Sequence, residues 1–156
     1  MDGTICQRGV QIYPYTRDGG VWVYQRSGKH SIGSWEIPAG KCEYNESFRE
    51  TAFREFKEET GLIISPGRFN YLFSHTVPSL NFIQDRKRWD TAVFGVVLND
   101  DELPRIMEPD NHALLRKFDF SDIEQLKKTL VFDLSEVIRK VCTTHNVPLT
   151  SEYESK

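Results

Sequence analysis

Short apolar runs bounded by turn residues fill the first part of the chain and predict β-strands. Residues 10–15 (VQIYPY) and 21–24 (VWVY) are two such runs, separated by Arg17-Asp18-Gly19-Gly20. Asp-Gly and Gly-Gly are common at hairpin turns, so we expect the two runs to pair as a hairpin. Residues 35–37 form a third, short run that stops at a proline, after which Ala39-Gly40 is expected to turn the chain.

The next segment has the apolar spacing of a helix. Phe48, Ala52 and Phe56 recur every four residues, which predicts a buried stripe along one helix face. Asn45 is expected to cap the helix at its N-terminus. Gly61 is expected to end the helix, because glycine tolerates the left-handed conformation common there.

Strand and helix patterns alternate through the rest of the chain. We expect strands at residues 69–75, 91–98 and 114–120, and an irregular acidic stretch at 99–111. We expect helices from Ser121 or Asp122 to Lys128 and over 132–144, with a frayed tail after about residue 147. No repeat or linker divides the sequence, so residues 1–156 are expected to be one α/β domain.

Composition and charge narrow the class of protein. The formal net charge is −3, which argues against a general nucleic-acid binder but not against a nucleotide taken with its metal. The three cysteines are widely spaced and fit a reducing compartment better than a disulfide framework. No apolar run approaches the roughly 20 residues of a membrane span, and no signal peptide is evident. The expected location is cytoplasmic.

Three glutamates at helical spacing are the strongest chemical clue. Glu55, Glu58 and Glu59 stand at i, i+3 and i+4, so their side chains are expected to crowd one helix face. Like charges there repel, whereas a hard divalent cation such as Mg²⁺ would bind between carboxylate oxygens. The alternative is a solvated helix face on which Arg54 pairs with Glu50 and Glu58.

The residues around these glutamates resemble the Nudix box, G-x5-E-x7-R-E-U-x-E-E-x-G-U. The matching positions in residues 40–62 are Gly40, Glu46, Arg54, Glu55, Phe56, Glu58, Glu59, Gly61 and Leu62. A chance match at one start position is on the order of 10⁻⁹ to 10⁻¹⁰. Two departures are small: an aromatic residue at the first apolar position of the box, and Ala39 where the family commonly has glycine.

The resemblance implies a Nudix fold, a mixed β-sheet sandwiched between α-helices, and hydrolysis of a nucleoside diphosphate linked to another group. It implies Mg²⁺ or Mn²⁺, held by Glu55, Glu58 and Glu59 with the backbone carbonyl of Ala39. It also implies that Arg54 orients Glu55 and that Glu46 supports the loop, with Gly40 and Gly61 structural. No Ser, Cys or His nucleophile is required, because metal-assisted transfer to water rests on positioning and electrostatics.

Residues outside the box are less distinctive. Glu108 is the expected acid outside the box that acts as a metal ligand or base, with Asp100, Asp101, Glu102 and Asp110 as rivals. The alternative is that these acids belong to a solvated loop without a catalytic role. Arg26 is expected to face the phosphates, the alternative being a surface arginine. Trp89, Phe73 and Phe118 are candidates to stack a base or to join the core, and Asn111 to read a base edge.

The substrate is the least determined part of the prediction. A compact chain of this size resembles the MutT-type enzymes, so we expect a (d)NTP hydrolysed to a monophosphate and pyrophosphate. ADP-ribose or a nucleotide sugar is the first alternative, and dinucleoside polyphosphates or capped RNA are the next. A non-catalytic nucleotide-binding module is the alternative of another class. The expected partner is a small nucleotide, and a homodimer is a family-level expectation.

Overall fold

The fold is described from a computed structural model, and the description covers residues 3, 5–27, 33–79 and 82–119. The strands are β1 (Ile5–Thr16), β2 (Gly20–Arg26), β3 (Trp35–Glu36), β4 (Ala39–Lys41), β5 (Asn70–Pro78), β6 (Lys87–Leu98) and β7 (His112–Asp119). The helices are α1 (Phe48–Thr60), the 3₁₀ turn η1 (Pro66–Arg68) and the short α2 (Phe82–Asp85).

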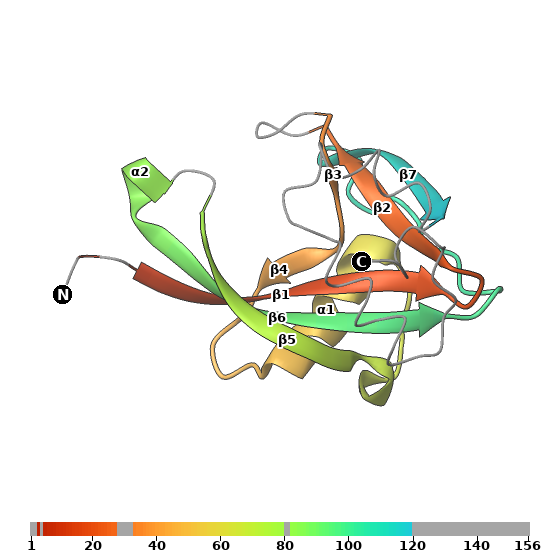
Figure 1. The fold of residues 1–156 in the computed structure, drawn as a ribbon, viewed down its shortest axis with the longest axis horizontal. Coiled ribbons are helices and arrows are strands. Elements are labelled where there is room, and N and C mark those ends of the chain that lie inside the picture. Colours follow the sequence, from red (N-terminus) through yellow and green to blue (C-terminus); the bar gives the residue numbers. More distant parts are fainter. Residues whose placement is uncertain (1–2, 4, 28–32, 80–81, 120–156) are drawn as a thin grey trace, which may run out of the picture.

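Within these residues the strands form one mixed sheet (Figure 1). Its order is β3-β2-β1-β6-β5, while β4 pairs with β1 and β7 pairs with β2. Strands β1 and β6 run parallel along their whole length, from Ile5 beside Lys87 to Thr16 beside Leu98. The other pairs are antiparallel. The expected α/β class is therefore confirmed.

The predicted hairpin is present, but its two strands soon separate. Strands β1 and β2 follow one another through a turn at Gly19, and Tyr15 pairs with Val21. The two strands pair only next to the turn. Farther from the turn, the same edge of β1 therefore needs another partner. Strand β4 supplies it, with Gly40 opposite Val10. The prediction that Ala39-Gly40 turns the chain was wrong, because these residues satisfy the backbone of β1 as a strand.

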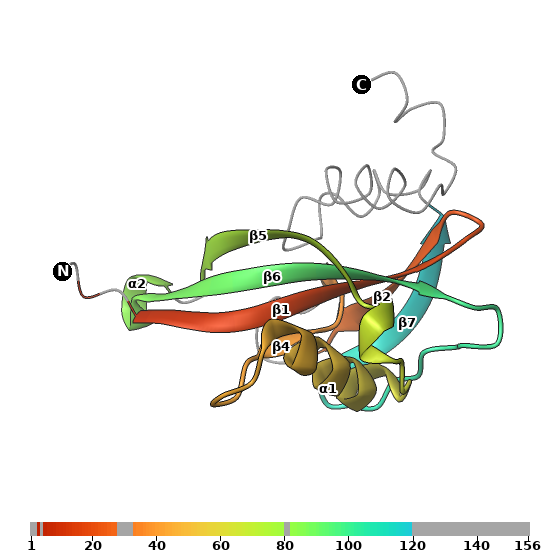
Figure 2. The same ribbon diagram turned by 90° about the horizontal axis from the view of Figure 1, so that it is seen from below.

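Helix α1 covers one face of the sheet (Figure 2). Its residues Ala52 and Phe56 are fully buried against alternate residues of β1 and β6, such as Val10 and Phe94. The predicted apolar stripe is confirmed, although Phe48 is only partly buried. This packing fixes the helix relative to the sheet, and with it the direction of its glutamate face.

The N-terminal cap of α1 differs from the prediction. Ser47, not Asn45, is the cap: its side chain accepts the N–H of Glu50, and the Glu50 carboxylate accepts the N–H of Ser47. Asn45 instead adopts a left-handed conformation, with φ of 64°. At the other end, Gly61 has φ of 78° and donates to the carbonyl of Lys57, so the predicted C-cap is confirmed.

The remaining boundaries shift by a few residues. Strand β6 begins at Lys87 rather than at residue 91, because parallel pairing with β1 extends the ladder to Ile5. Strand β5 runs on to Pro78, and β7 covers His112–Asp119 rather than 114–120. The helices expected from residue 121 and over 132–144, and the tail after about 147, lie outside the described residues.

Candidate active site

The backbone of β4 lies directly against the carboxylates of α1. The N–H of Ala39 donates to Glu59 Oε2 over 2.9 Å, which ties the start of β4 to the last turn of the helix. A Cβ atom at position 40 would overlap the carboxyl group of Glu55. Glycine is therefore required at position 40 by this close approach, not by an unusual φ angle.

Arg54 organises the acidic face of the helix. Its Nε and Nη2 donate to the two carboxylate oxygens of Glu46 over 2.8 and 2.9 Å. Its Nη1 donates to Glu55 over 2.8 Å and to Glu58 over 3.2 Å. Arg54 thus pairs with Glu58 as expected, but Glu46 takes the place expected of Glu50, whose carboxylate serves the helix cap.

Contacts with Arg54 and burial shift the pKa values of the glutamates in opposite directions. Hydrogen bonds from Arg54 lower the pKa of Glu46 to about 2, so this carboxylate is ionised at neutral pH. Burial raises the pKa of Glu55, although Arg54 opposes the shift. Burial raises the pKa of Glu59 well above its usual range, and the nearby charges of Glu55 and Glu108 act in the same direction.

The residues fit a hard divalent cation by their chemistry. The carboxylates of Glu55 and Glu59 are partly removed from water, and the negative charge of Glu55 acts on Glu59. A bound cation would offset both the desolvation and the repulsion between the charges. Carboxylate and carbonyl oxygens are the ligands that Mg²⁺ prefers. In the described part of the chain, no three His, Cys, Asp or Glu side chains are already gathered closely enough to form a ready-made metal site. Glu58 is half exposed, with 51% of its side chain accessible.

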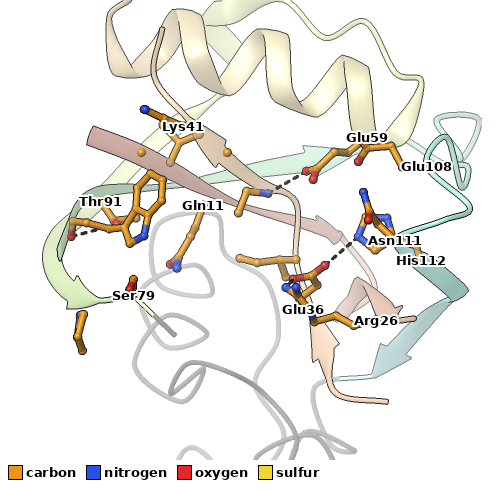
Figure 3. A pocket seen from close by; sticks show the side chains of 17 residues that line it. Gln11, Arg26, Glu36, Lys41, Glu59, Ser79, Thr91, Glu108, Asn111 and His112 are labelled. Atoms are coloured by element: carbon orange, nitrogen blue, oxygen red, sulfur yellow. Dashed lines mark hydrogen bonds and ion pairs between the residues drawn. The ribbon is translucent and has the colours of Figure 1, made fainter. Parts of the chain in front are cut away.

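A cavity of about 420 Å³ opens beside Glu59, whereas Glu55 and Glu58 are not among its lining residues (Figure 3). Glu59 and Glu108 lie at one part of its wall, and Gln11 and Thr91 of the sheet lie at another. The remaining lining residues are Gly9, Val10, Arg26, Glu36, Ile37, Ala39, Gly40, Lys41, Pro78, Ser79, Trp89, Asn111 and His112. The cavity therefore joins the acidic end of α1 to the surface of the sheet.

The structure separates the candidate acids of the loop after β6. Glu108 lines the cavity, whereas Asp100, Asp101 and Asp110 do not. Glu102 makes a two-pronged pair with Arg68, over 2.7 and 2.6 Å, and thereby anchors the loop.

The other candidates divide in a similar way. Trp89, Asn111 and Arg26 line the cavity. Phe73 and Phe118 do not; Phe118 instead packs edge-on against Trp35, with ring centroids 5.2 Å apart.

An ionic cluster that no sequence pattern indicated lies at one side of the cavity. Glu36 accepts a hydrogen bond from Arg26 over 2.5 Å, and its other oxygen lies 2.8 Å from His112 Nε2. His112 is buried and packs against the ring of Tyr24 in a tilted arrangement, with ring centroids 4.6 Å apart and planes inclined by 38°. Glu36 and His112 are 76 residues apart in the chain, so no local pattern indicated their contact. Arg26 therefore reaches the cavity wall already paired to a carboxylate.

Comparison with known proteins places this geometry in a family. A curated RNA pyrophosphohydrolase of Erythrobacter litoralis (strain HTCC2594) is 39% identical over 46 residues, which cover 30% of this chain and 28% of that protein. A MutT NUDIX hydrolase of Burkholderia pseudomallei is 25% identical, with a TM-score of 0.64 over 75% of this chain and 85% of that one.

A third relative shares the fold at lower identity. It is the NUDIX domain of Shewanella oneidensis NrtR, solved with ADP ribose, with a TM-score of 0.70 and 18% identity over 90% of this chain and 89% of that one. No helix in the described ranges is long and apolar enough to cross a membrane. The NUDIX domain family matches residues 7–141, most of the sequence. This match shows that the chain belongs to the NUDIX family.

Proposed function

We propose that the protein hydrolyses a pyrophosphate bond in a nucleoside diphosphate derivative, and that its substrate is a (d)NTP cleaved to a monophosphate and pyrophosphate. The observation that carries this proposal is the placement of Glu59. Its carboxylate is partly buried, accepts a hydrogen bond from the Ala39 N–H, and lines the same cavity as Glu108. The family and the hydrolases among its relatives support a hydrolase acting on phosphorus-containing anhydrides.

The residues of the box would have separate roles in metal binding and in positioning. Glu55, Glu58 and Glu59, with the Ala39 carbonyl, would hold Mg²⁺ or Mn²⁺, which when bound neutralises phosphate charge and activates water. Arg54 holds Glu55 in place, and Glu46 in turn holds Arg54, so the two act as positioning residues. Glu108 is the candidate acid or base outside the box, because it shares the cavity wall with Glu59.

Arg26 is the candidate contact to the substrate phosphates. It lines the cavity, and its pairing with Glu36 fixes the guanidinium there. Because this pairing offsets its charge, we expect Arg26 to contribute orientation more than net attraction.

Other substrates of the same class form the first alternative. ADP-ribose or a nucleotide sugar is supported by the ADP-ribose complex of a protein with the same fold, and capped RNA by the name of the Erythrobacter relative, an RNA pyrophosphohydrolase. Dinucleoside polyphosphates complete the set. The cytoplasmic location and the homodimer remain predictions, which fractionation and sedimentation would test.

A substrate panel with matched variants tests the proposal. The panel contains canonical and oxidised dNTPs, ADP-ribose, nucleotide sugars, diadenosine polyphosphates and capped RNA, each with Mg²⁺ and with Mn²⁺. We expect pyrophosphate release from a (d)NTP, lost at least a hundredfold in Glu58→Gln and in Glu59→Gln. Glu108→Gln should lower turnover strongly without unfolding the protein, while Asp101→Asn in the same loop should leave turnover unchanged. Equal turnover in wild type and Glu108→Gln would remove Glu108 from the mechanism.

The alternative of another class is a nucleotide-binding module without catalysis. It predicts that the metal-loaded protein hydrolyses nothing in the panel yet binds a nucleotide. Calorimetry of the same nucleotides in the presence of Mg²⁺ separates this outcome from a protein that binds none of them.

A further inference from the structure

A largely buried glutamine of the central strand carries an amide that has no hydrogen-bond partner among the described residues. Gln11 is only 4% exposed, yet no hydrogen bond joins its side chain to any of the described residues. It lines the cavity, and its side chain points into it from β1 (Figure 3). The amide is therefore open to the cavity rather than enclosed in the core, and its donor and acceptor are available to a ligand that enters there.

The position of Gln11 separates it from the core. Its neighbours Val10 and Ile12 pack beneath α1, and alternation along a strand places Gln11 on the opposite face of the sheet. Thr91 of β6 shares that face, because its neighbour Ala92 also belongs to the core under α1. The amide therefore faces the part of the cavity that lies beyond the acidic end of the helix.

An aromatic ring lines the same cavity as this amide. Trp89 lines the same cavity and is only partly buried, so part of its indole is available to a ligand. A Cβ atom at position 9 would come within 3.0 Å of the ring, so Gly9 is what lets the indole lie against β1. An aromatic surface beside an amide donor and acceptor is suited to a flat ring with polar edges.

We propose that Gln11 and Trp89 form the nucleobase subsite of this cavity, and that Gln11 determines which base is accepted. This inference rests on the proposed function, because it assigns the base of the same nucleotide whose phosphates lie toward Glu59. The amide of Gln11 offers one donor and one acceptor, which matches a base edge carrying an adjacent acceptor and donor. Trp89 packs against the base and contributes affinity with little discrimination.

Binding of nucleoside monophosphates tests the subsite without requiring catalysis. Calorimetry with AMP, GMP, CMP and UMP is expected to show a preference of about tenfold or more for one base in the wild type. Gln11→Met keeps the size of the side chain but removes the amide, and should abolish that preference. Gln7→Met, four residues earlier on the same face of β1 and outside the cavity, is the matched control and should leave the preference intact.

Two further variants distinguish base reading from a structural role. Gln11→Glu removes the donor and keeps acceptors, so it should shift the preference toward guanine, whose N1–H and N2–H are neighbouring donors. Trp89→Leu should weaken all four nucleotides about equally, by roughly tenfold. A merely structural Gln11 would lower affinity for all bases alike without a change of preference.

The outcomes for the subsite and for the proposed function are separable. A base preference that is lost in Gln11→Met but accompanied by no hydrolysis supports the subsite and contradicts the catalytic proposal. Hydrolysis of a (d)NTP with equal affinity for all four bases, or with a preference unchanged in Gln11→Met, overturns the subsite and leaves the catalytic proposal standing.

Discussion

At the scale of single residues, the site depends on the close approach of the Gly40 backbone to the Glu55 side chain. Gly40 and Glu55 come from β4 and α1, and the glutamate carboxyl occupies the space in which a Cβ at position 40 would lie. The glycine of the box is thus explained by a contact between two elements. A sequence pattern indicates that a glycine stands there, but only the packing of α1 on the sheet shows which side chain demands it.

This contact predicts a loss of activity from the smallest possible substitution. Gly40→Ala should displace the Glu55 carboxyl, lower stability by about 1–3 kcal/mol and reduce turnover at least tenfold. Gly67→Ala is the matched control, because nothing lies within 4 Å of its Cβ position. Steady-state kinetics and thermal unfolding measure both effects. If Gly40→Ala behaves like Gly67→Ala, the close approach of β4 to Glu55 does not exist in solution.

Gln11 and His112 are site residues whose surroundings a local sequence pattern could not reveal. Gln11 interrupts an apolar run in a predicted strand, but its place in the cavity wall depends on what surrounds it in three dimensions. His112 meets Glu36 only because β7 and β3 both pair with β2. The box glutamates were recognisable because helical spacing is a local property, whereas these contacts are made by the sheet.

At the scale of elements, α1 shows both the strength and the limit of sequence patterns. The spacing of Ala52 and Phe56 identified the buried face correctly, because a stripe of apolar residues has few alternatives. The first turn was misassigned because Asn45 and Ser47 are both good capping residues by type. The left-handed turn at Asn45 moves the start of the helix two residues further along, and the reciprocal hydrogen bonds with Glu50 select Ser47.

The cap predicts a measurable contribution to stability. Ser47→Ala removes the hydrogen bond to the Glu50 N–H and should lower the free energy of unfolding by about 1 kcal/mol. Ser65→Ala is the control, because Ser65 stands in the cap position before η1 but makes no side-chain capping bond. Urea denaturation of the two variants provides the comparison. Equal loss in both would mean that the side chain of Ser47 does not cap the helix.

The pair between Glu46 and Arg54 predicts how stability depends on pH. The folded pKa of Glu46 is about 2, below its ordinary value of 4.5, so the pair stabilises the fold fully above about pH 4.5. That contribution is lost as the pH falls toward 2 and Glu46 takes up a proton. Glu46→Gln should therefore cost about 1.5 kcal/mol or more at pH 7, and the cost should shrink steadily between pH 4.5 and 2.

Urea denaturation at a series of pH values measures this effect. Glu43→Gln is the control, because Glu43 is 70% exposed and its oxygen lies 3.8 Å from Arg54. Its cost should be small at every pH, as for other exposed ion pairs. A cost of Glu46→Gln that does not change with pH would contradict the depressed pKa.

At the scale of the whole molecule, the loop between β6 and β7 is held from three sides. Arg68 forms a two-pronged salt bridge with Glu102 near the start of the loop. Arg105 donates its N–H to the carbonyl of Thr60 over 2.9 Å at the end of α1. The hydroxyl of Tyr24, from β2, donates to the carbonyl of Arg105 over 2.8 Å and lies 3.3 Å from that of Glu59. Sheet, helix and loop therefore meet at Tyr24.

This arrangement predicts that Tyr24 positions Glu108 without contacting the substrate. Tyr24→Phe keeps the buried ring but leaves the Arg105 carbonyl without its partner, at a cost of about 1–3 kcal/mol. Amide hydrogen exchange should rise in residues 99–111 more than in β1 or β6, and turnover should fall several-fold with KM little changed. Tyr44→Phe is the matched control, because Tyr44 is 94% exposed. Faster exchange throughout the sheet would mean that Tyr24 supports the core as a whole, whereas unchanged exchange in the loop would mean that its hydroxyl does not hold the loop at all.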